Sequence, residues 1–212
     1  MTDIASSLSA AKFIARKYIR GYSISSTFDT EEGLSAFSKA VQSSKCYLEY
    51  GSGSSTVLAA KFAQRIVSVE SDAVFCRAVR KMLPERAGIS LIHVDIGLTR
   101  QWGYPVFSRP TERRIRRWQK YPQAPWQSYD FSPDLLLIDG RFRVACALES
   151  LLHIGEETKI LIDDYPGRPY EIIEEFADRT ALYGTMAEFR KKKSFDSARC
   201  RAQLGLYYAD YR

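Results

Sequence analysis

The residues with the clearest chemical potential form the stretch C-Y-L-E-Y-G-S-G-S-S-T, residues 46–56. Strand-like residues lead into two glycines that are one residue apart, Gly51 and Gly53. Glycine permits a tight turn and lets a ligand approach the backbone closely. The free N–H groups of Ser54 and Ser55, which open the helix predicted after the turn, attract a negatively charged group. The stretch therefore predicts a binding turn between a strand and a helix.

Two classes of ligand use such a turn: dinucleotides through their pyrophosphate, and S-adenosylmethionine through its carboxylate end. The dinucleotide pattern G-x-G-x-x-G requires a third small residue where this chain has Thr56. Glu49 stands two residues before the first glycine, where a carboxylate would repel a pyrophosphate but would suit an ammonium and a sulfonium group. The turn therefore favours S-adenosylmethionine, and a dinucleotide of the NAD type is the alternative.

Acidic side chains stand at or near the end of five predicted strands. They are Glu49, Glu70, Asp95, Asp139 and the pair Asp163 and Asp164. The carboxyl ends of parallel strands share one edge, and carboxylates gathered there repel one another unless a cation or a cationic ligand is bound. Glu70 stands where nucleotide-binding sheets carry the acid that binds ribose hydroxyls. Asp95 would accept a hydrogen bond from an adenine amino group.

The elements that must position these acids alternate regularly along the chain. Strands are expected over residues 46–49, 65–70, 90–95, 134–139 and 159–163, and helices over residues 54–65, 72–83, 143–152 and 169–177. Apolar strands joined by helices predict an α/β fold, a doubly wound and mostly parallel Rossmann-like sheet with helices on both faces. Residues 185–189 and 204–211 would complete seven strands as an antiparallel pair at the C-terminal end.

Two further regions flank or interrupt this series. Residues 4–19 have apolar side chains at helical spacing and predict an amphipathic helix outside the sheet, acting as a lid or a dimer contact. A second helix is expected from about residue 30 to about residue 43. Residues 96–133 contain all three tryptophans and leave the carboxyl end of the third strand. We expect this long segment to fold over the ligand as a substrate cap, and a loop packed on the side of the domain is the alternative.

These motifs together resemble a class I S-adenosylmethionine-dependent methyltransferase. The resemblance rests on E-Y-G-S-G-S-S-T, V-S-V-E, H-V-D-I-G, L-L-L-I-D-G and I-L-I-D-D, and it covers residues 46 to about 180. It implies N-terminal helices in residues 1–45 and a cofactor-binding domain in residues 46–212, in which the terminal strand pair is the reversed hairpin of that family. It also implies the roles of single residues: Glu49, Gly51 and Gly53 around the methionine end, Glu70 on the ribose and Asp95 near the adenine.

The sequences I-D-G and I-D-D are similar to those of metal-dependent O-methyltransferases that act on catechols or on natural-product sugars. The resemblance implies one Mg²⁺ held by Asp139, Asp163 and Asp164, which would lower the pKa of an acceptor hydroxyl. The sugar-specific relatives carry a further acid two residues after the first ligand, where this chain has Arg141. An arginine can hardly take a proton near neutral pH. We therefore expect Arg141 to bind a carboxylate or phosphate of the acceptor, and the base stays unnamed.

The alternative is a site without a metal ion. Asp163 and Asp164 could instead pair with an arginine: Arg141, Arg143 or Arg168.

Composition limits the class of protein. The 212 residues are 45% apolar and 26% charged, as in an ordinary globular domain, and no run of eighteen apolar residues predicts a membrane span. The four cysteines lack metal-binding spacing, and a cytoplasmic location is expected. The net charge of +6 is modest, and the fourth strand lacks the N-P-P-Y type of sequence that base-modifying relatives carry. Both observations argue against a nucleic-acid partner.

The sequence therefore predicts an enzyme that moves a methyl group from S-adenosylmethionine to an oxygen atom of a small, anionic acceptor, with a nitrogen atom as the less favoured alternative. Asp139 and Arg141 are its expected catalytic residues. Three alternatives share the fold: a protein that binds a NAD-type dinucleotide, a non-catalytic binding module, and an RNA methyltransferase. A homodimer is one assembly that the N-terminal helices would allow.

Overall fold

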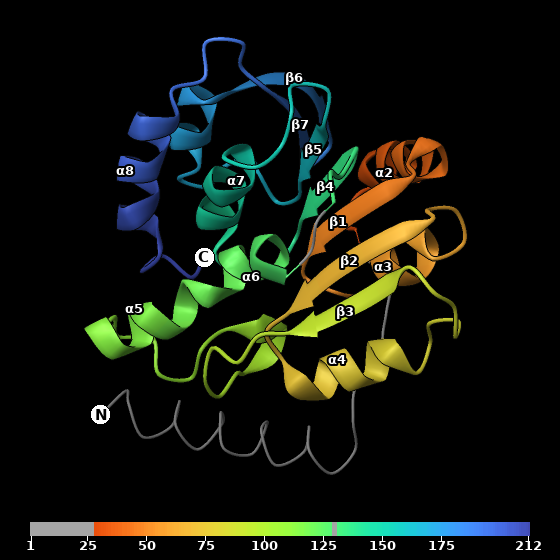
Figure 1. The fold of residues 1–212 in the computed structure, drawn as a ribbon, viewed down its shortest axis with the longest axis horizontal. Helices are drawn as coiled ribbons and strands as arrows, with labels where there is room; N and C mark the ends of the chain where they lie inside the picture. Colours follow the sequence, from red (N-terminus) through yellow and green to blue (C-terminus); the bar gives the residue numbers. More distant parts are fainter. Residues whose placement is uncertain (1–27, 129–130) are drawn as a thin grey trace.

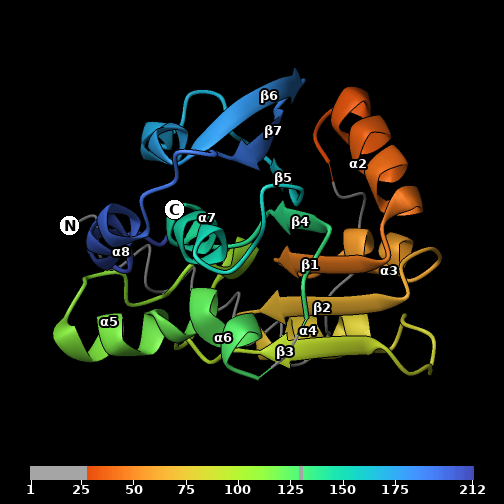
Figure 2. The same ribbon diagram turned by 45° about the horizontal axis from the view of Figure 1, so that its top comes forward.

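A computed structural model describes residues 28–128 and 131–212 (Figure 1). The helix expected over residues 4–19 lies outside the described residues. One seven-stranded sheet crosses the molecule with helices on both of its faces (Figure 2). Its strands are β1 (Cys46–Tyr50), β2 (Arg65–Glu70), β3 (Ile89–His93), β4 (Leu135–Ile138), β5 (Lys159–Ile162), β6 (Ala177–Tyr183) and β7 (Met186–Lys191).

The strand order is β3-β2-β1-β4-β5-β7-β6. Strands β1 to β5 are mutually parallel, and β7 runs antiparallel to both β5 and β6. The chain builds outward from β1 to β3 and then returns to place β4 on the other side of β1, so the order reverses between β1 and β4. Ligands of open α/β sheets bind beyond the carboxyl ends of the strands at such a reversal. The predicted fold class is confirmed.

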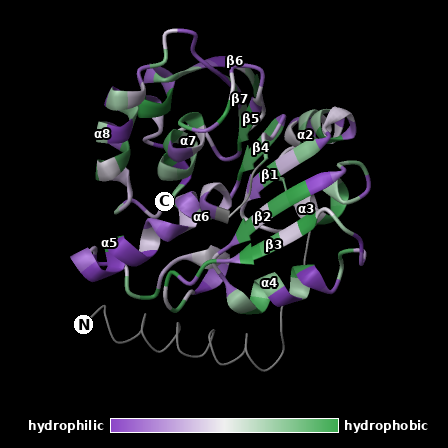
Figure 3. Ribbon diagram, viewed as in Figure 1, coloured by the Kyte–Doolittle hydropathy of each residue, from purple (hydrophilic) through white to green (hydrophobic). Residues whose placement is uncertain are grey.

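Both layers of helices have a matching set of strand side chains. Helices α2 (Glu31–Ser43), α3 (Ser54–Ala59) and α4 (Ala73–Arg80) lie on one face. Helices α5 (Glu112–Trp118), α6 (Lys120–Ser128), α7 (Arg143–Leu151) and α8 (Ser197–Tyr207) lie on the other. Tyr47 of β1 packs in the cluster that contains Phe37 of α2, whereas its neighbour Leu48 packs in the cluster that contains Leu148 of α7. Because both faces are covered, the central strands are largely buried, and β4 is apolar along its whole length (Figure 3).

Helix α2 belongs to this core. Thr30 caps it by accepting a hydrogen bond from the Gly33 N–H at 3.2 Å, as the start signal near residue 30 predicts. Phe37 and Val41 are fully buried, one turn apart on the side that faces the sheet. The part of the predicted N-terminal region that the structure describes is therefore packed on the sheet.

The antiparallel pair exists, but one of its two predicted strands was wrong. Strand β7 overlaps the predicted residues 185–189, whereas its partner is β6 and not residues 204–211. Most side chains of β6 are exposed, and an edge strand of this kind carries charged residues that hide it from an apolar pattern. Residues 204–207 instead end α8, which Asp196 caps and which buries Cys200 and Leu204 four residues apart. In place of the helix expected over residues 169–177, the structure has only a short 3₁₀ helix, η2 (Glu171–Glu175).

The segment predicted as a substrate cap divides into two parts. Helices α5 and α6 lie in the helical layer, where Trp118 and Tyr121 are buried against Phe142. Residues 98–106 form a short hairpin in which the Val106 N–H donates to the Leu98 carbonyl at 2.8 Å, with the 3₁₀ turn η1 (Gln101–Gly103) at its tip. The hairpin tip reaches the carboxyl edge of the sheet, where a Cβ atom on Gly103 would lie 3.6 Å from the Arg141 side chain. Among the described residues, no helix is long and apolar enough to cross a membrane.

Candidate functional site

The two glycines of the turn after β1 have different roles. Gly51 has a φ of 94°, and a Cβ atom there would lie 2.7 Å from the Gly140 nitrogen in the loop after β4. The turn therefore packs directly on the neighbouring loop at the point where the strand order reverses. Gly53 is extended, and a Cβ atom there would meet nothing within 4 Å. Gly51 is thus required by the protein's own packing, whereas Gly53 borders open space.

Glu49 is fully buried and bound by three hydroxyl groups. Tyr47 and Ser55 each donate to its carboxylate at 2.7 Å, and Thr56 donates to its other oxygen. Thr56 in turn accepts from the Gly53 N–H at 2.9 Å. Burial raises the pKa of Glu49 against the opposing effect of these hydrogen bonds. In this geometry Glu49 fixes the turn to β1, and it would act on a ligand through the turn and not by direct contact.

Glu70, at the end of β2, lies beside the same turn. Its carboxylate accepts hydrogen bonds from the backbone N–H groups of Ser52 at 3.2 Å, of Ser71 at 2.7 Å and of Asp72 at 2.7 Å. Burial raises the pKa of Glu70 to about 7, although these three N–H groups act in the opposite direction. Glu49 and Glu70 therefore hold the glycine turn from two neighbouring strands.

The start of α3 carries an unsatisfied polar atom. Among the described residues, the buried hydroxyl oxygen of Ser54 is one of two side-chain atoms without a hydrogen-bond partner. The Ser55 hydroxyl, by contrast, already donates a hydrogen bond to the Glu49 carboxylate. A buried hydroxyl without a partner calls for a ligand or a water molecule. Ser54 lies next to the open side of Gly53, so the turn retains a donor for a bound polar group.

Asp95 follows β3 and is bound to the helical layer. Its carboxylate pairs with Arg117 of α5 and accepts from the Gly97 N–H at 3.0 Å. Partial burial acts to raise the pKa of Asp95, but hydrogen bonds from Arg117 and Gly97 outweigh it and lower the pKa overall. The side chain is still 62% exposed. A contact between Asp95 and an adenine stays a prediction.

An arginine lies among the three acids that were expected to hold Mg²⁺. The Arg143 guanidinium is 3.0 Å from the Asp139 carboxylate and 3.3 Å from the Asp164 carboxylate. It also donates to the carbonyl oxygens of Gly140, at 3.1 Å, and of Asp163. Asp164 receives a second cation, Arg168, at 3.3 Å. The alternative pairing with arginines therefore fits the structure.

The magnesium site stays a prediction, and this geometry gives it no support. No group of three or more acidic, histidine or cysteine side chains is arranged to hold a metal ion in the part of the chain that the structure describes. The physical reason is that the Arg143 side chain, from the first turn of α7, folds back between the ends of β4 and β5 and neutralises the carboxylates there. Burial raises the pKa of Asp139, Arg143 lowers it, and the charges of Asp163 and Asp164 raise it further.

Arg141 follows Gly140, whose backbone packs on Gly51 of the glycine turn. It is only 8% exposed, and it forms no ion pair within residues 28–128 and 131–212. Its guanidinium carbon lies 4.2 Å from the centre of the Tyr104 ring, in the hairpin that follows β3. A buried guanidinium is normally paired with a carboxylate. Arg141 therefore carries a positive charge that the described residues do not neutralise by an ion pair.

The hairpin crosses the end of β1. A Cβ atom on Gly103, at its tip, would lie 3.1 Å from the Ser71 hydroxyl and 3.6 Å from the Arg141 side chain. Ser71 follows β2 and Arg141 follows β4, and β1 lies between these two strands. The tip therefore spans the carboxyl end of β1, where the glycine turn begins. The hairpin is the part of the expected substrate cap that is in position to cover this turn.

Backbone strain is concentrated at the same edge. The described residues other than glycine that have a left-handed φ are Trp102 (61°), Phe142 (58°) and Asp164 (53°). Trp102 lies in the hairpin after β3, Phe142 follows β4, and Asp164 follows β5. Strained backbone of this kind persists where the surroundings enforce it, and it clusters at active and ligand-binding sites. The strain thus marks the carboxyl edge independently of the acids.

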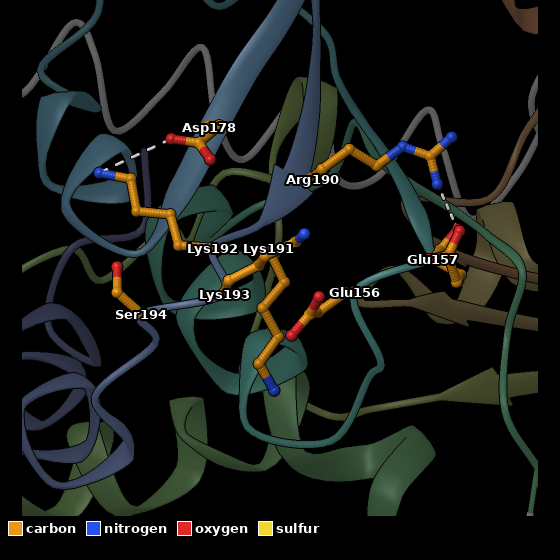
Figure 4. A pocket seen from close by; sticks show the side chains of 8 residues that line it. All are labelled: Glu156, Glu157, Asp178, Arg190, Lys191, Lys192, Lys193 and Ser194. Atoms are coloured by element: carbon orange, nitrogen blue, oxygen red, sulfur yellow. Dashed lines mark hydrogen bonds and ion pairs between the residues drawn. The ribbon is translucent and has the colours of Figure 1, made fainter.

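The two best-defined cavities lie elsewhere. One, of about 610 Å³, opens at the amino edge of the sheet between residues 156–157 and residues 190–194 (Figure 4). The other, of about 650 Å³, lies between α2 and the strands β5, β6 and β7. Neither is lined by a residue that the sequence predicts for the site. The candidate site therefore rests on strand order, hydrogen bonding and strain, and not on cavity size.

Two aromatic residues at the site were not singled out by sequence reasoning. Tyr104 covers Arg141, as described above. Tyr121 of α6 is fully buried, contacts Gly140, and donates to the Val69 carbonyl at 3.2 Å. The Gly51 N–H donates to that same carbonyl at 2.9 Å. The only sequence feature that could have indicated Tyr104 and Tyr121 as site residues is the high aromatic content of residues 96–133.

Comparison with known proteins agrees with this architecture. No protein-family model and no curated protein matches the sequence. The crystal structure of a methyltransferase-like protein from Silicibacter pomeroyi is 32% identical, covers 88% of this chain and 98% of its own, and has a TM-score of 0.78. The N-methyltransferase NodS from Bradyrhizobium japonicum, solved with S-adenosyl-L-homocysteine, is 10% identical over 89% of this chain and 99% of its own, with a TM-score of 0.50, and shows the fold alone. An O-methyltransferase from Bacillus cereus, 14% identical over 89% and 91% of the two chains with a TM-score of 0.47, is too distant to bear on the acceptor.

The strand order with its reversed β7, and the glycine turn at the reversal beside β1, define the class I methyltransferase architecture. With a relative that is 32% identical over almost its whole length, the chain belongs to the class I S-adenosylmethionine-dependent methyltransferases.

Proposed function

We propose that this enzyme methylates an oxygen atom of a small, anionic acceptor that binds at the carboxyl edge of β4. The observation that carries the proposal is the buried Arg141 guanidinium, which has no carboxylate partner in the described chain and lies beside the glycine turn. A charged group that the fold buries without a partner is costly unless a ligand neutralises it. A carboxylate, a phosphate or another anionic oxygen of the acceptor would do so.

The glycine turn fits the cofactor of this family. Gly53 leaves space beside the backbone, and the Ser54 hydroxyl offers an unused hydrogen bond. We assign the methionine end of the cofactor to the turn, including the N–H groups of Ser54 and Ser55. Glu49 positions this turn through its hydrogen bonds with Ser55 and Thr56. When bound, S-adenosylmethionine supplies a methyl group on a positively charged sulfur. Glu70 is assigned to the ribose hydroxyls and Asp95 to the adenine, as the resemblance implies.

The protein's own contribution to the reaction is placement. Transfer of a methyl group requires the acceptor oxygen to approach in line with the breaking bond, so orientation supplies much of the rate. Arg141 would bind the acceptor, and the hairpin of residues 98–106 would exclude water above it. Asp139 is a positioning residue in this proposal: through Arg143 it holds the loop of residues 140–142 that carries Arg141. No step is assigned to a metal ion.

Titration calorimetry with S-adenosylhomocysteine and with NAD⁺ tests the cofactor part of the proposal. We expect a saturable heat with S-adenosylhomocysteine and none with NAD⁺. At a ligand concentration one hundred times its Kd, binding should also raise the free energy of unfolding by about 2.7 kcal/mol. Binding of NAD⁺ without binding of S-adenosylhomocysteine would overturn it in favour of a dinucleotide-binding protein. A second assay compares Arg141→Met with wild type, and a KM for the acceptor that does not change would overturn the role of Arg141.

A further inference from the structure

The guanidinium of Arg141 is covered by a planar ring that the chain itself supplies. The Tyr104 ring lies over it with 4.2 Å between the ring centre and the guanidinium carbon, which is stacking distance for a cation–π contact. Tyr104 in turn contacts the edge of the Tyr211 ring, with 6.2 Å between the ring centres. One face of the Arg141 guanidinium is therefore packed against a flat aromatic ring.

The same position favours a negatively charged oxygen on that ring. Partial burial acts to raise the pKa of Tyr104, but the charges of Arg141 and Arg168 outweigh it and lower the pKa below its ordinary value. Arg168 is held at 3.3 Å from Asp164. Two guanidinium groups thus act on one phenol, and this arrangement stabilises the phenolate form.

Tyr104 belongs to a hairpin that is closed by its own hydrogen bonds. Its hairpin is closed internally by the hydrogen bond from the Arg100 N–H to the Tyr104 carbonyl at 2.8 Å. The hairpin base is anchored by Thr99, whose hydroxyl donates to Asp72 at 2.8 Å. At the tip, Trp102 is 74% exposed and has a strained φ. The ring of Tyr104 on Arg141 is the contact that holds this strained tip over the site.

We infer that the methyl acceptor is a phenol, whose ring takes the place of Tyr104 on Arg141 when the hairpin swings aside. Tyr104 then acts as an internal stand-in that keeps the buried guanidinium covered until the acceptor arrives. The inference rests on the proposed function, because it names the class of acceptor at the same site.

The step balances without a metal ion and without a dedicated base. The phenol loses its proton to solvent because the two arginines stabilise the phenolate that remains. The phenolate oxygen donates an electron pair to the methyl carbon, the bond from oxygen to carbon forms, and the bond from sulfur to carbon breaks. The sulfonium becomes a neutral thioether, so the products are an aryl methyl ether, S-adenosylhomocysteine and one proton in solution. This chemistry fits an edge at which the carboxylates are already paired with Arg143.

4-Nitrophenol is the probe, because its phenolate form is coloured and reports its own ionisation in the bound state. We expect it to bind wild-type protein weakly, since Tyr104 competes for Arg141, and to bind with its pKa lowered. Tyr104→Leu should tighten its Kd about tenfold. Tyr104→Phe keeps a ring over Arg141 and should bind the probe as weakly as wild type. Arg141→Met should remove the larger part of the pKa shift of the bound probe, because Arg168 remains.

Controls separate this inference from the proposed function and from loss of folding. Nitrobenzene, which has the ring but no hydroxyl, should not gain affinity in Tyr104→Leu. Arg113→Met removes an exposed arginine of α5 and should leave the probe unaffected. The melting temperature and the affinity for S-adenosylhomocysteine are measured on every variant, and loss of S-adenosylhomocysteine binding in wild type would be a failure of the proposed function itself. With cofactor binding intact, equal probe affinity in wild type and Tyr104→Leu, or an unchanged probe pKa in Arg141→Met, overturns the inference.

Discussion

The two edges of the sheet both carry clusters of charge, but they use them differently. At the amino edge, around the 610 Å³ cavity, Lys191 and Lys192 donate to the carbonyl oxygens of Ile154 and Glu174, and Arg190 donates to that of Glu157. Lys192 also lies 3.9 Å from Asp178 (Figure 4). These cations satisfy the backbone of neighbouring loops. At the carboxyl edge, Arg141 is buried without an ion pair in the described chain, and the strained residues gather around it.

The difference shows that a hollow lined by charges is a poor guide to function on its own. Cationic side chains that already donate hydrogen bonds to backbone carbonyl oxygens gain little more from binding a ligand. Charges that the fold buries without partners, at a cost to stability, indicate a site that a ligand completes. The amino edge has a cavity of about 610 Å³ with basic side chains around it, yet Arg141 and Ser54, which lack such partners in the described chain, lie at the carboxyl edge. Substitutions that contrast the two edges test this reading.

The largest effect is expected from the arginine that neutralises the acids. Arg143→Met removes the one cation that contacts both Asp139 and Asp164 and that is 4% exposed, which should lower the free energy of unfolding by about 3–5 kcal/mol. The matched change at the amino edge, Arg190→Met, removes one hydrogen bond to a carbonyl and should cost about 0.5–1.5 kcal/mol. Urea unfolding at about pH 7.5, where both arginines are charged, measures both. Equal costs would contradict the contrast between the edges.

The next effect concerns glycine. Gly51→Ala places a Cβ atom 2.7 Å from the Gly140 backbone at a φ of 94°, so it should destabilise the fold by about 2–4 kcal/mol. Gly155→Ala, beside the amino edge, has open space around its Cβ position and should be neutral within about 0.5 kcal/mol. Gly53→Ala also has room in the protein, so it should leave stability unchanged but weaken S-adenosylhomocysteine. Thermal unfolding and calorimetry separate the three outcomes, and a Gly53 variant with unchanged affinity would remove Gly53 from the cofactor site.

Much of this architecture could be predicted from the sequence, because its signals are local. The alternation of apolar strands with helices, the glycine turn and the acids at strand ends are all set by residue type and spacing. The edge strand β6 could not be predicted, since its exposed residues carry no apolar pattern. In α8 the buried Cys200 and Leu204 are separated by a helical interval, which the run of apolar and aromatic residues near the C-terminus obscures.

The candidate site was predictable only in part, for a different reason. Residue type and strand position brought Glu49, Glu70, Asp139 and Asp164 to one edge, but not the direction of their oxygens. Glu49 turns toward Ser55 and Thr56, and this depends on the path of the chain through the turn. The contact of Tyr104 with Arg141 joins segments that follow two different strands. Such contacts are set by strand order and loop length together.

A moderate effect of pH on cofactor affinity follows from Glu70, whose pKa burial raises to about 7. Since the pKa in the folded protein lies above its unfolded value, Glu70 favours folding most below the unfolded pKa, and this contribution is lost as the pH rises toward 7. Ribose hydroxyls donate to the ionised form, so binding of S-adenosylhomocysteine should weaken as the pH falls below about 7. The limit is about tenfold in Kd per pH unit. Calorimetry from pH 8 to pH 5.5 measures this, with Glu70→Gln as the comparison. If the Kd of the wild-type protein depends on pH no more than that of Glu70→Gln, Glu70 does not bind the ribose.

The smallest effect is expected from removal of divalent metal ions. In metal-dependent methyltransferases the acids at the ends of the fourth and fifth strands hold the ion, whereas here the Arg143 guanidinium lies 3.0 Å from Asp139 and 3.3 Å from Asp164. A divalent ion placed there would face the positive charge of the arginine and would have to displace it from both carboxylates and from the carbonyl oxygens of Gly140 and Asp163. Treatment with a chelator should therefore leave methyl transfer within about twofold of the untreated rate, less than the tenfold that 1.4 kcal/mol represents.

Arg143→Met is the informative partner, because it exposes the acids to each other. If that variant gains activity on addition of Mg²⁺ while wild type does not, the arginine occupies the position that an ion takes in the metal-dependent relatives. Loss of wild-type activity on chelation, restored by Mg²⁺, would show instead that Arg143 leaves the acids during the reaction.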